Sequence, residues 1–410
     1  MKILILSAQP PSPFSGGEIR LLNLIKHLSN AHDFTVLALV HNKSDQLMDY
    51  AGRYCRFIPV LVSDTTPQKS HLYWVLNSWK NSLFSRLPYH VRDFYSPLFQ
   101  KEVKNLLRSE TFNLLQVQQL YMVQYLPSSI ACPTILDVDN LWSKLLLRRA
   151  KKDHRDRLTI QLQRWIDDRK IPAYEKREIN KFNACLAVSE ADLRFIKSSA
   201  PHAFTEIVSN GVDTAHFYPE WQVPARECLA QYLLFIGTMG YEPNVDAVKY
   251  FVYEIFPRIC ARKPETYFKI VGRNPPAEVI ALAKEPFITV TGFVEDIRPY
   301  LANSSVFVVP VRTGAGTRIK ILEAMAMGKA VVSTSIGAEG LDVRDGENII
   351  LADDPSEFAE KVNLLLENRE LRDKLGRNGL RLVDSHYDWS AIASRLGNLY
   401  QLLQRQGNLR

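Results

Sequence analysis

Short apolar runs alternate with amphipathic segments along most of the 410-residue chain. The runs have the length of strands and most are apolar throughout, which is typical of parallel strands covered on both faces. Between them, apolar residues recur at spacings of three and four, which predicts helices. The pattern therefore predicts an α/β protein with parallel sheets. The predicted strands are 2–7, 34–40, 114–121, 134–140, 186–189, 232–236, 268–271, 306–309 and 330–334, with another beginning at 288, and the main predicted helices are 18–28, 190–197, 245–262, 318–327, 355–366, 371–383 and 390–404.

The length of the chain predicts two domains, because a single hydrophobic core rarely organises 410 residues. The apolar content of 46% and charged content of 23% are those of a soluble globular protein. The first apolar run, residues 2–6, is too short for a signal peptide, and no run approaches the roughly 18 residues of a membrane span. Five scattered cysteines without CxxC spacing favour buried free thiols and a cytoplasmic location.

The most informative stretch is 314–328, GAGTRIKILEAMAMG, which lies between two predicted buried strands. Gly314 and Gly316 predict a flexible loop, Thr317 is a candidate N-cap, and 318–327 is the helix that follows. A strand, a glycine loop and a helix N-terminus together present unpaired backbone N–H groups to an anion. The sequence thus predicts an anion site here.

Charged residues in the same stretch narrow the class of anion that would bind. Arg318 and Lys320 lie in the first helical turn, where positive charge opposes the helix macrodipole unless an anion is bound. Glu323 shares a helix face with Lys320, about 4.5 Å further along the axis. A cation near the loop and a carboxylate one turn later suit a diphosphate followed by a ribose diol. The alternative is a solvated helix start with an i,i+3 ion pair.

This stretch resembles the retaining nucleotide-sugar glycosyltransferases of family 4. Glu323-Ala-Met-Ala-Met-Gly328 and the strand ending in Ser333-Thr334 match the second half of the family pattern. The first half departs, because the family's earlier glutamate falls at Ala315. A branch of the family carries Gly-x-Gly-Thr-Arg-x-Lys at this point, and residues 314–320 follow that branch.

The resemblance implies a GT-B fold, with two Rossmann-like doubly wound domains that face a deep interdomain cleft. It implies an acceptor domain over 1–218, a donor domain over 219–384, and a final helix, 385–410, that packs back on the first domain. It further implies a retaining hexosyltransferase that needs no metal or other cofactor. The donor would be a UDP- or GDP-linked sugar, and the acceptor a glycan or lipid-linked glycan, as in polysaccharide synthesis.

The resemblance also implies roles for single residues. The resemblance assigns donor binding to glycines that follow predicted strands, to the passage that reads the base edge and to the 314–323 stretch. The loop 237–244 lacks the Arg and Lys that family members often place there to hold the diphosphate, so our hypothesis is that Arg318 and Lys320 supply that charge from the later helix. Gln118 falls where the family often has a histidine or carboxylate beside the sugar, and it cannot act as a general base. The predicted donor-binding residues are Gly16, Gly17, Gly237, Gly272, Phe293, Val294, Gly314, Gly316, Thr317, Arg318, Lys320 and Glu323.

For the acceptor, the resemblance points to Asp137 and Asn140, an Asp-x-x-Asn element at the end of strand 134–140. Helix capping by Asp139 or Asn140 is an equally good interpretation. Residues 144–181 carry 13 Lys/Arg against 6 Asp/Glu, and residues 71–95 are rich in aromatic residues. The basic segment would suit an anionic membrane surface on the inner face, a phosphorylated acceptor or a polyanionic glycan, with a solvated helix as the alternative. The aromatic segment would suit anionic lipid or a lipid-linked acceptor, with core packing or the lining of an acceptor cleft as the alternative. No nucleic-acid motif accompanies them.

Two other functions fit the same sequence. A sugar-nucleotide epimerase or a phosphorylase would share the fold and the nucleotide site. A non-catalytic partner subunit would keep the fold without turnover, and Ala315 and Gln118 motivate that interpretation because both lack a side chain that the family often uses.

Overall fold

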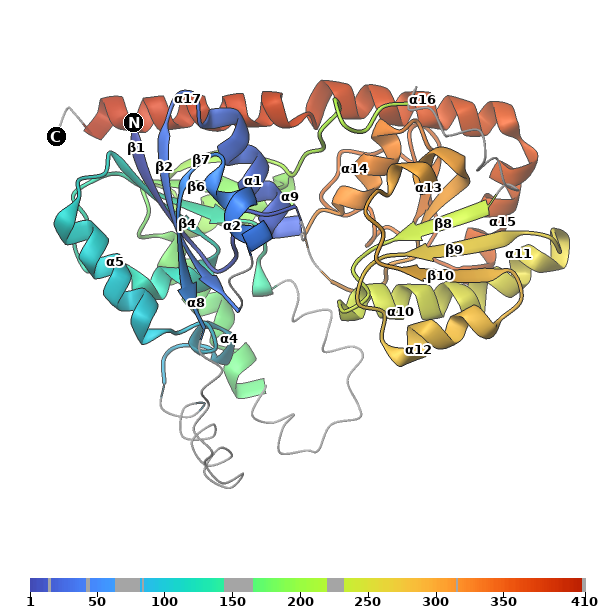
Figure 1. The fold of residues 1–410 in the computed structure, drawn as a ribbon, viewed down its shortest axis with the longest axis horizontal. Helices are drawn as coiled ribbons and strands as arrows, with labels where there is room; N and C mark the ends of the chain where they lie inside the picture. Colours follow the sequence, from blue (N-terminus) through green and yellow to red (C-terminus); the bar gives the residue numbers. More distant parts are fainter. Residues whose placement is uncertain are drawn as a thin grey trace. The chain divides into compact units, whose positions relative to one another are not determined.

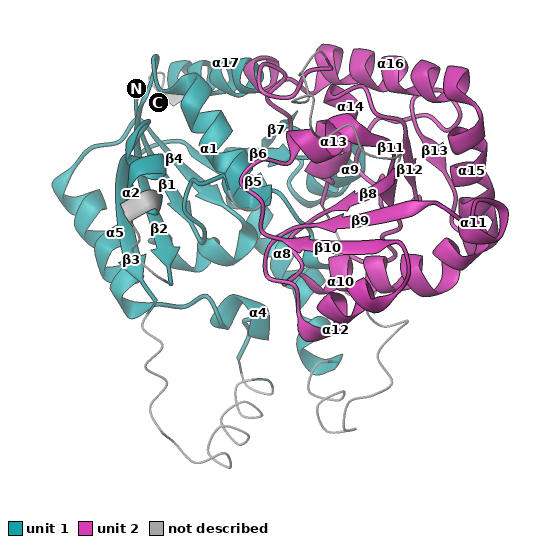
Figure 2. Ribbon diagram, turned by 45° about the vertical axis from the view of Figure 1, so that its right-hand side comes forward, with its two compact units in different colours: residues 1–209, 393–410 teal, residues 210–392 magenta. Residues whose placement is uncertain are grey.

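The computed structural model describes residues 1–13, 16–41, 45–62, 82, 85–143, 165–219, 232–314 and 316–407. They form two compact units (Figure 2). Unit 1 comprises residues 1–209 and 393–410, and unit 2 comprises residues 210–392. Each unit contains a parallel sheet and its own hydrophobic core.

Unit 1 is built on a seven-stranded sheet in the order β3-β2-β1-β4-β5-β6-β7, in which every neighbouring pair is parallel. The central strands are buried almost throughout, as their apolar runs predicted, and a buried Leu or Ile side chain contributes about 1.5–3 kcal/mol. The strands are β1 Lys2–Ser7, β2 Asp33–Val40, β3 Arg56–Leu61, β4 Leu114–Gln118, β5 Thr134–Val138, β6 Ala184–Ala187 and β7 Phe204–Ile207.

The helices of unit 1 connect these strands (Figure 1). Two of them begin at serine caps whose hydroxyls accept backbone N–H bonds, Ser96 before α5 and Ser189 before α9. The helices are α1 Gly16–Leu28, α2 Asp45–Gly52, α4 Tyr89–Arg92, α5 Pro97–Ser109, the 3₁₀ helix η1 Leu120–Tyr125, α8 Ile171–Ile179 and α9 Glu190–Ser199.

Unit 2 contains a six-stranded parallel sheet in the order β10-β9-β8-β11-β12-β13. The side chains of β8, β11 and β12 are all buried, so these strands form the centre of the core. The strands are β8 Tyr232–Ile236, β9 Tyr267–Val271, β10 Ile288–Gly292, β11 Ser304–Val309, β12 Val331–Ser333 and β13 Ile350–Leu351.

The helices of unit 2 include one irregularity, a π-helical turn (η3) over Phe251–Ile255 between α10 and α11. The last helix, α17, begins in unit 2 and passes into unit 1 at Ala393. The others are α10 Glu242–Tyr250, α11 Phe256–Arg262, α12 Ala277–Ile280, the 3₁₀ helix η4 Ala281–Lys284, α13 Arg298–Asn303, α14 Ile319–Ala326, α15 Pro355–Glu367, α16 Arg369–His386 and α17 Trp389–Gly407.

Both sheets reverse their strand order at the first strand of the unit. In unit 1 the chain adds β2 and β3 on one side of β1 and then β4 on the other side. In unit 2 it adds β9 and β10 on one side of β8 and then β11 on the other. Ligands of doubly wound folds bind beyond the carboxyl ends of the strands at such a switch point. The loops after β1 and β4, and those after β8 and β11, are therefore where sites are expected.

The chain divides earlier than the predicted boundary after residue 218, and it returns later than residue 385. The physical reason is one set of backbone bonds within unit 2. The N–H of Val212 donates to the Tyr387 carbonyl at 2.8 Å, and the N–H of Trp389 donates to the Val212 carbonyl at 3.3 Å. Both segments are thus tied to unit 2. The segment in which the crossing was predicted, 219–227, lies outside the described residues after 219.

Among the predicted elements whose bounds differ from the structure, two bear on the site. The strand predicted over 114–121 ends at Gln118, because Gln119 has a φ of 75° and Leu120 begins η1. The helix predicted from 318 begins at Ile319 with Arg318 as its N-cap. Thr317 is not the cap, and its hydroxyl instead accepts a hydrogen bond from Asn210 Nδ2 at 2.5 Å.

Candidate functional site

The switch point of unit 2 brings together the loop after β8 and the glycine loop, residues 314–318, that precedes α14. Gly314 and Gly316 have φ angles of 103° and 80°, a region that favours glycine, while Ala315 between them lies outside the described residues. The first N–H groups of a helix lack i−4 partners, and in α14 that of Ile321 donates to the Arg318 carbonyl at 2.9 Å, which leaves the N–H groups before it for a ligand. Arg318 curls back over this loop, and its Nη2 donates to the Thr313 carbonyl at 3.4 Å.

Lys320 is positioned by three elements of unit 2. Its Nζ donates to Asn244 Oδ1 at 2.9 Å and lies 4.1 Å from the centroid of the Phe235 ring. Asn244 is itself held, because its Nδ2 donates to the Thr238 carbonyl at 2.8 Å. A Cβ on Gly237 would lie only 2.6 Å from Lys320 Nζ. The ammonium therefore lies against the backbone at the carboxyl end of β8, as a phosphate-binding cation would.

The side chains of the predicted pair Lys320 and Glu323 are both half-buried. Burial lowers the pKa of Lys320 to about 7, and the nearby Arg318 guanidinium lowers this pKa in the same direction. Burial raises the pKa of Glu323 to about 7, while the positive charge of Lys320 opposes that rise. Each group therefore carries its charge at a cost in desolvation, and a bound anion would offset that cost for Lys320.

Another predicted donor glycine, Gly272, is needed for close packing. Gly272 has a φ of 151°, and a Cβ there would lie 1.8 Å from the Gly237 carbonyl oxygen. The loops after β8 and β9 can therefore touch only because Gly272 has no side chain.

Phe293 and Val294 follow β10. The Phe293 side chain is 66% exposed, whereas Val294 packs against the core. An exposed aromatic ring on the loop after β10 is consistent with the predicted base-reading passage.

The switch point of unit 1 is polar around Gly17. A Cβ on Gly17, beside Gly16 at the start of α1, would lie 2.6 Å from Gln9 Oε1 and 3.6 Å from Asp139 Oδ2. Gln119 Nε2 donates to Asp139 Oδ2 at 3.0 Å, and the Tyr121 hydroxyl donates to Gln119 Oε1 at 2.5 Å. Burial raises the pKa of Asp139 to about 6.

The predicted acceptor residues Asp137 and Asn140 differ from Asp139 in their hydrogen-bond partners. Asp137 is fully buried, and both of its oxygens are bound by Arg20, at 2.9 and 3.0 Å. Gln118 Nε2 donates to Asp137 Oδ2 at 3.1 Å, which places Gln118 in the interior as well. Asn140 is half-buried, and its Oδ1 has no hydrogen-bond partner among the described residues. Sugar contacts by Gln118 and Asp137 stay predictions, which this placement does not favour.

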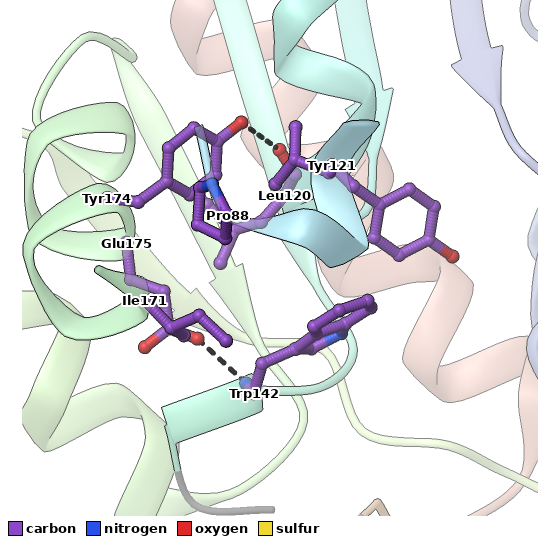
Figure 3. A pocket seen from close by; sticks show the side chains of 8 residues that line it. Pro88, Leu120, Tyr121, Trp142, Ile171, Tyr174 and Glu175 are labelled. Carbon is purple, nitrogen blue, oxygen red and sulfur yellow. Dashed lines mark hydrogen bonds between the residues drawn. The ribbon is translucent and has the colours of Figure 1, made fainter. Parts of the chain in front are cut away.

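An apolar pocket of unit 1 lies between η1 and α8 (Figure 3). Tyr174 donates to the Leu120 carbonyl at 3.2 Å, and Glu175 Oε1 accepts the Trp142 N–H at 2.7 Å. Tyr121 lines the pocket with its ring and reaches Gln119 with its hydroxyl, so the pocket adjoins the polar switch point. It is lined by Pro88, Val91, Leu120, Tyr121, Trp142, Ile171, Tyr174 and Glu175.

Sequence reasoning missed five of these residues. In the sequence, Asn244 directly precedes a predicted helix and Asn210 belongs to an Asn-Gly turn, and both look purely structural. Only the fold brings Asn244 to Lys320 and Asn210 to Thr317. Gln119 and Tyr121 were placed inside a strand, which hid the turn that brings both to Asp139. The sequence predicts Asp139 as a carboxylate at the ligand-binding rim or as a helix cap, without either of these partners. A glutamine at the end of a buried strand was the signal that would have found Gln119.

Some predictions fall on residues that are only partly described. Residues 71–81, 83–84 and 144–164 lie outside the described ranges, as does Cys228. Of the described thiols, Cys185 is buried and Cys55, Cys132 and Cys260 are half-buried. Across the described ranges, His, Cys, Asp and Glu side chains form no cluster suited to a metal. No helix in that part of the chain is both long and apolar enough to cross a membrane.

Comparison with known proteins supports the predicted family and fold. Residues 230–368 match the family model described as glycosyl transferases group 1. Phosphatidyl-myo-inositol mannosyltransferase of Mycobacterium tuberculosis (strain H37Rv) is 27% identical over 232 residues, which are 54% of this chain and 60% of that protein. The chain spans about half the length of the curated relatives it matches.

Solved structures extend the likeness over the whole chain. The sucrose-phosphate synthase of Thermosynechococcus elongatus superposes with a TM-score of 0.73 at 16% identity, over 98% of each chain. The Anabaena protein HepE, solved in complex with UDP and glucose, superposes with a TM-score of 0.66 at 14% identity, over 97% of this chain and 99% of that one. These likenesses confirm the predicted GT-B fold of two parallel-sheet α/β domains.

Proposed function

We propose that this protein is a glycosyltransferase that moves a sugar from a nucleoside-diphosphate-sugar donor to a glycan or lipid-linked acceptor. The position of Lys320 carries the proposal. Its ammonium lies against Gly237 and Asn244 at the switch point of unit 2, behind a glycine loop and at the start of α14. The match of residues 230–368 to glycosyl transferases group 1 covers this site.

In this proposal the diphosphate binds the N-terminal N–H groups of α14 and the Lys320 ammonium. Arg318 adds positive charge, and Glu323, one helical turn later, accepts hydrogen bonds from the ribose hydroxyls. The exposed Phe293 and the loop after β10 lie next to the base. Charge that develops on the departing diphosphate is balanced by these groups, which is how preorganised donors lower a barrier.

The transfer itself is proposed to retain the anomeric configuration and to need no metal. The acceptor oxygen bonds to the anomeric carbon as the bond from that carbon to the diphosphate oxygen breaks. The acceptor proton passes to the departing phosphate oxygen, and a nucleoside diphosphate leaves. Because Gln118 cannot take a proton, the side chains of unit 1 bind and orient the substrate in this proposal. The retained configuration and the independence of metal both rest on the family resemblance.

The acceptor side of the proposal rests on unit 1. The carboxylate of Asp139 and the amide of Gln119 are typical partners for sugar hydroxyls, and they lie beside the loop that begins α1. The adjoining apolar pocket would suit an apolar group near the acceptor hydroxyl, which favours a lipid-linked glycan. A cytoplasmic protein attached peripherally to an anionic membrane would meet such an acceptor.

The test is release of nucleoside diphosphate from UDP- and GDP-sugars in the presence and absence of lipid-linked and free glycan acceptors. Acceptor-dependent release with a new glycoside of retained configuration is the expected result. Conversion of the sugar nucleotide without an acceptor would instead indicate an epimerase. A protein that binds nucleotide but turns over no donor with any acceptor would indicate a non-catalytic partner subunit. Added EDTA should leave turnover unchanged.

A further inference from the structure

The peptide at which the chain leaves unit 1 is held on both sides. The carbonyl oxygen of Ser209, the last residue of unit 1 before the crossing, accepts a hydrogen bond from Arg20 Nη1 at 2.9 Å. Asn210, the first residue of unit 2, donates through Nδ2 to Thr317 Oγ1 at 2.5 Å. Both residues are buried, with exposed fractions of 7% and 8%. Each bond therefore has little competition from water.

In unit 1, Arg20 joins Ser209 to the start of α1. Arg20 lies in the helix that begins with Gly16 and Gly17, and its side chain is fully buried. Its Nε and Nη2 bind Asp137 at the end of β5, so its guanidinium has a fixed orientation. A shift of Ser209 would pull on this guanidinium and hence on the first turns of α1.

The same network reaches the returning helix. The Tyr400 hydroxyl on α17 donates to Gln116 Oε1 at 2.5 Å, and Gln116 Nε2 donates to Gln118 Oε1 at 3.4 Å. Gln118 in turn donates to Asp137. Both passages of the chain between the units, at Ser209 and along α17, are thus anchored in unit 1 on the Arg20–Asp137 pair.

In unit 2, Asn210 holds the middle of the glycine loop. Thr317 lies between Gly316 and Arg318 and is 9% exposed, so the hydrogen bond from Asn210 fixes a buried residue of that loop. The loop contains two glycines with positive φ, whose backbone has more freedom than that of other residues. The hydrogen bond to Thr317 restricts the backbone of the loop at the place where its N–H groups would face a phosphate.

We propose that the Ser209–Asn210 peptide couples the glycine loop of unit 2 to the first turns of α1 in unit 1, with Asn210 and Arg20 as its positioning residues. Neither residue touches ligand in this scheme. The inference rests on the proposed function, because it takes the glycine loop as the nucleotide-diphosphate site. Its consequence is that Arg20 in unit 1 affects nucleotide affinity in unit 2, and that this effect passes through Asn210.

The test is a double-mutant cycle on UDP and GDP affinity, measured by calorimetry with the full-length protein. Arg20→Lys keeps the charge and loses the forked geometry, and Asn210→Ala removes the donor to Thr317. We expect Arg20→Lys to weaken nucleotide binding about fivefold or more, the lower end of usual coupling. In the Asn210→Ala background the same change should have less than about a twofold effect.

Matched controls separate positioning from folding. Arg56→Lys alters a partly exposed ion pair with Glu110 in unit 1 and should leave affinity unchanged. Thr317→Val removes the hydroxyl that accepts from Asn210 and should behave like Asn210→Ala. Should Arg20→Lys not fold, the Thr317 and Asn210 variants are combined instead. Non-additive losses between them are then expected, and hydrogen exchange of α1 on adding UDP should differ between wild type and Asn210→Ala.

Three results would overturn the inference. One is an unchanged affinity in Arg20→Lys, and another is an equal loss in both backgrounds. The third, for the substitute experiment, is additive losses together with unaltered exchange of α1. Failure of the wild-type protein to bind any nucleoside diphosphate would overturn the proposed function as well. A wild type that binds nucleotide with an additive cycle would overturn only the coupling.

Discussion

The two switch points have the same topology and opposite chemistry. In unit 2, Lys320 lies against the backbone of Gly237 with Arg318 nearby, so the site is built for an anion. In unit 1, Gly17 lies beside Gln9 and Asp139, side chains that suit uncharged hydroxyl groups. Parallel-sheet topology fixes where a site forms, whereas the side chains after β1, β4, β8 and β11 decide what it binds.

Asp137 and Asp139 of unit 1 differ in how their negative charge affects the free energy of unfolding. Asp137→Asn leaves the buried Arg20 without its counter-charge, which should destabilise the protein by about 3–5 kcal/mol. Asp139 has a pKa raised from 3.8 to about 6 by burial, so ionised Asp139 weakens folding as pH rises from about 4 to about 6. Asp139→Asn removes that loss and should not lower the free energy of unfolding at pH 7. Urea unfolding of both variants checks this, and equal losses would contradict it.

Removal of the cation in unit 2 should have the largest effect on turnover. Lys320→Ala removes the ammonium that faces the proposed diphosphate, and we expect kcat/KM for the sugar nucleotide to fall by about 10²–10³. Lys249→Ala serves as the control, because Lys249 forms an exposed ion pair with Glu278 on α12. Nucleoside diphosphate release measures both. Wild-type kinetics in Lys320→Ala would remove the basis of the proposed site.

Alanine substitutions at Gly272 and Gly292, one crowded and one open, test the packing of the donor loops. A Cβ at Gly272 would lie 1.8 Å from the Gly237 carbonyl, whereas one at Gly292 would meet nothing within 4 Å. Both residues have positive φ, so Gly292→Ala should cost only the backbone strain of about 1 kcal/mol. Gly272→Ala should cost distinctly more and reduce nucleotide affinity. Thermal unfolding and UDP titration of the two variants compare them, and equal effects would contradict the close approach of the two loops.

The smallest expected effect is a dependence of nucleotide binding on pH. Because the pKa of Lys320 is about 7, its positive charge is present below pH 7 and is lost as pH rises through that value. Affinity for UDP or GDP should therefore fall by up to about tenfold between pH 6.5 and 8.5. Lys320→Arg keeps its charge and should flatten this part of the profile. Identical slopes in the two proteins would assign the dependence to another group.

The sequence predicted most of the fold because its strands are apolar on both faces. β1, β8 and β11 were found within two residues at each end, and the α/β rhythm led to two parallel sheets. The predicted strand over 114–121 was too long because the left-handed turn at Gln119 has no glycine to mark it. The N-cap was wrong because Thr317 binds Asn210, a partner 107 positions away.

The site was predictable only where its residues are close in sequence. The glycine loop, Lys320 and Glu323 lie within ten positions, so helix geometry sufficed to group them. Asn244 is 76 positions from Lys320 and could be found only from the fold. In unit 1 the resemblance pointed to Asp137, but the buried Arg20 binds that carboxylate, and Asp139 lies beside Gly17 instead. Long-range pairing of charges cannot be read from spacing.

The central claim is that the cationic switch point of unit 2 holds a nucleoside diphosphate. Hydrogen exchange of the intact protein with and without saturating UDP or GDP tests it most directly. The account predicts slower exchange of the amides at 237–244 and 314–323 in the wild type, with little change there in Lys320→Ala. Nucleotide binding that leaves both segments unchanged would contradict it.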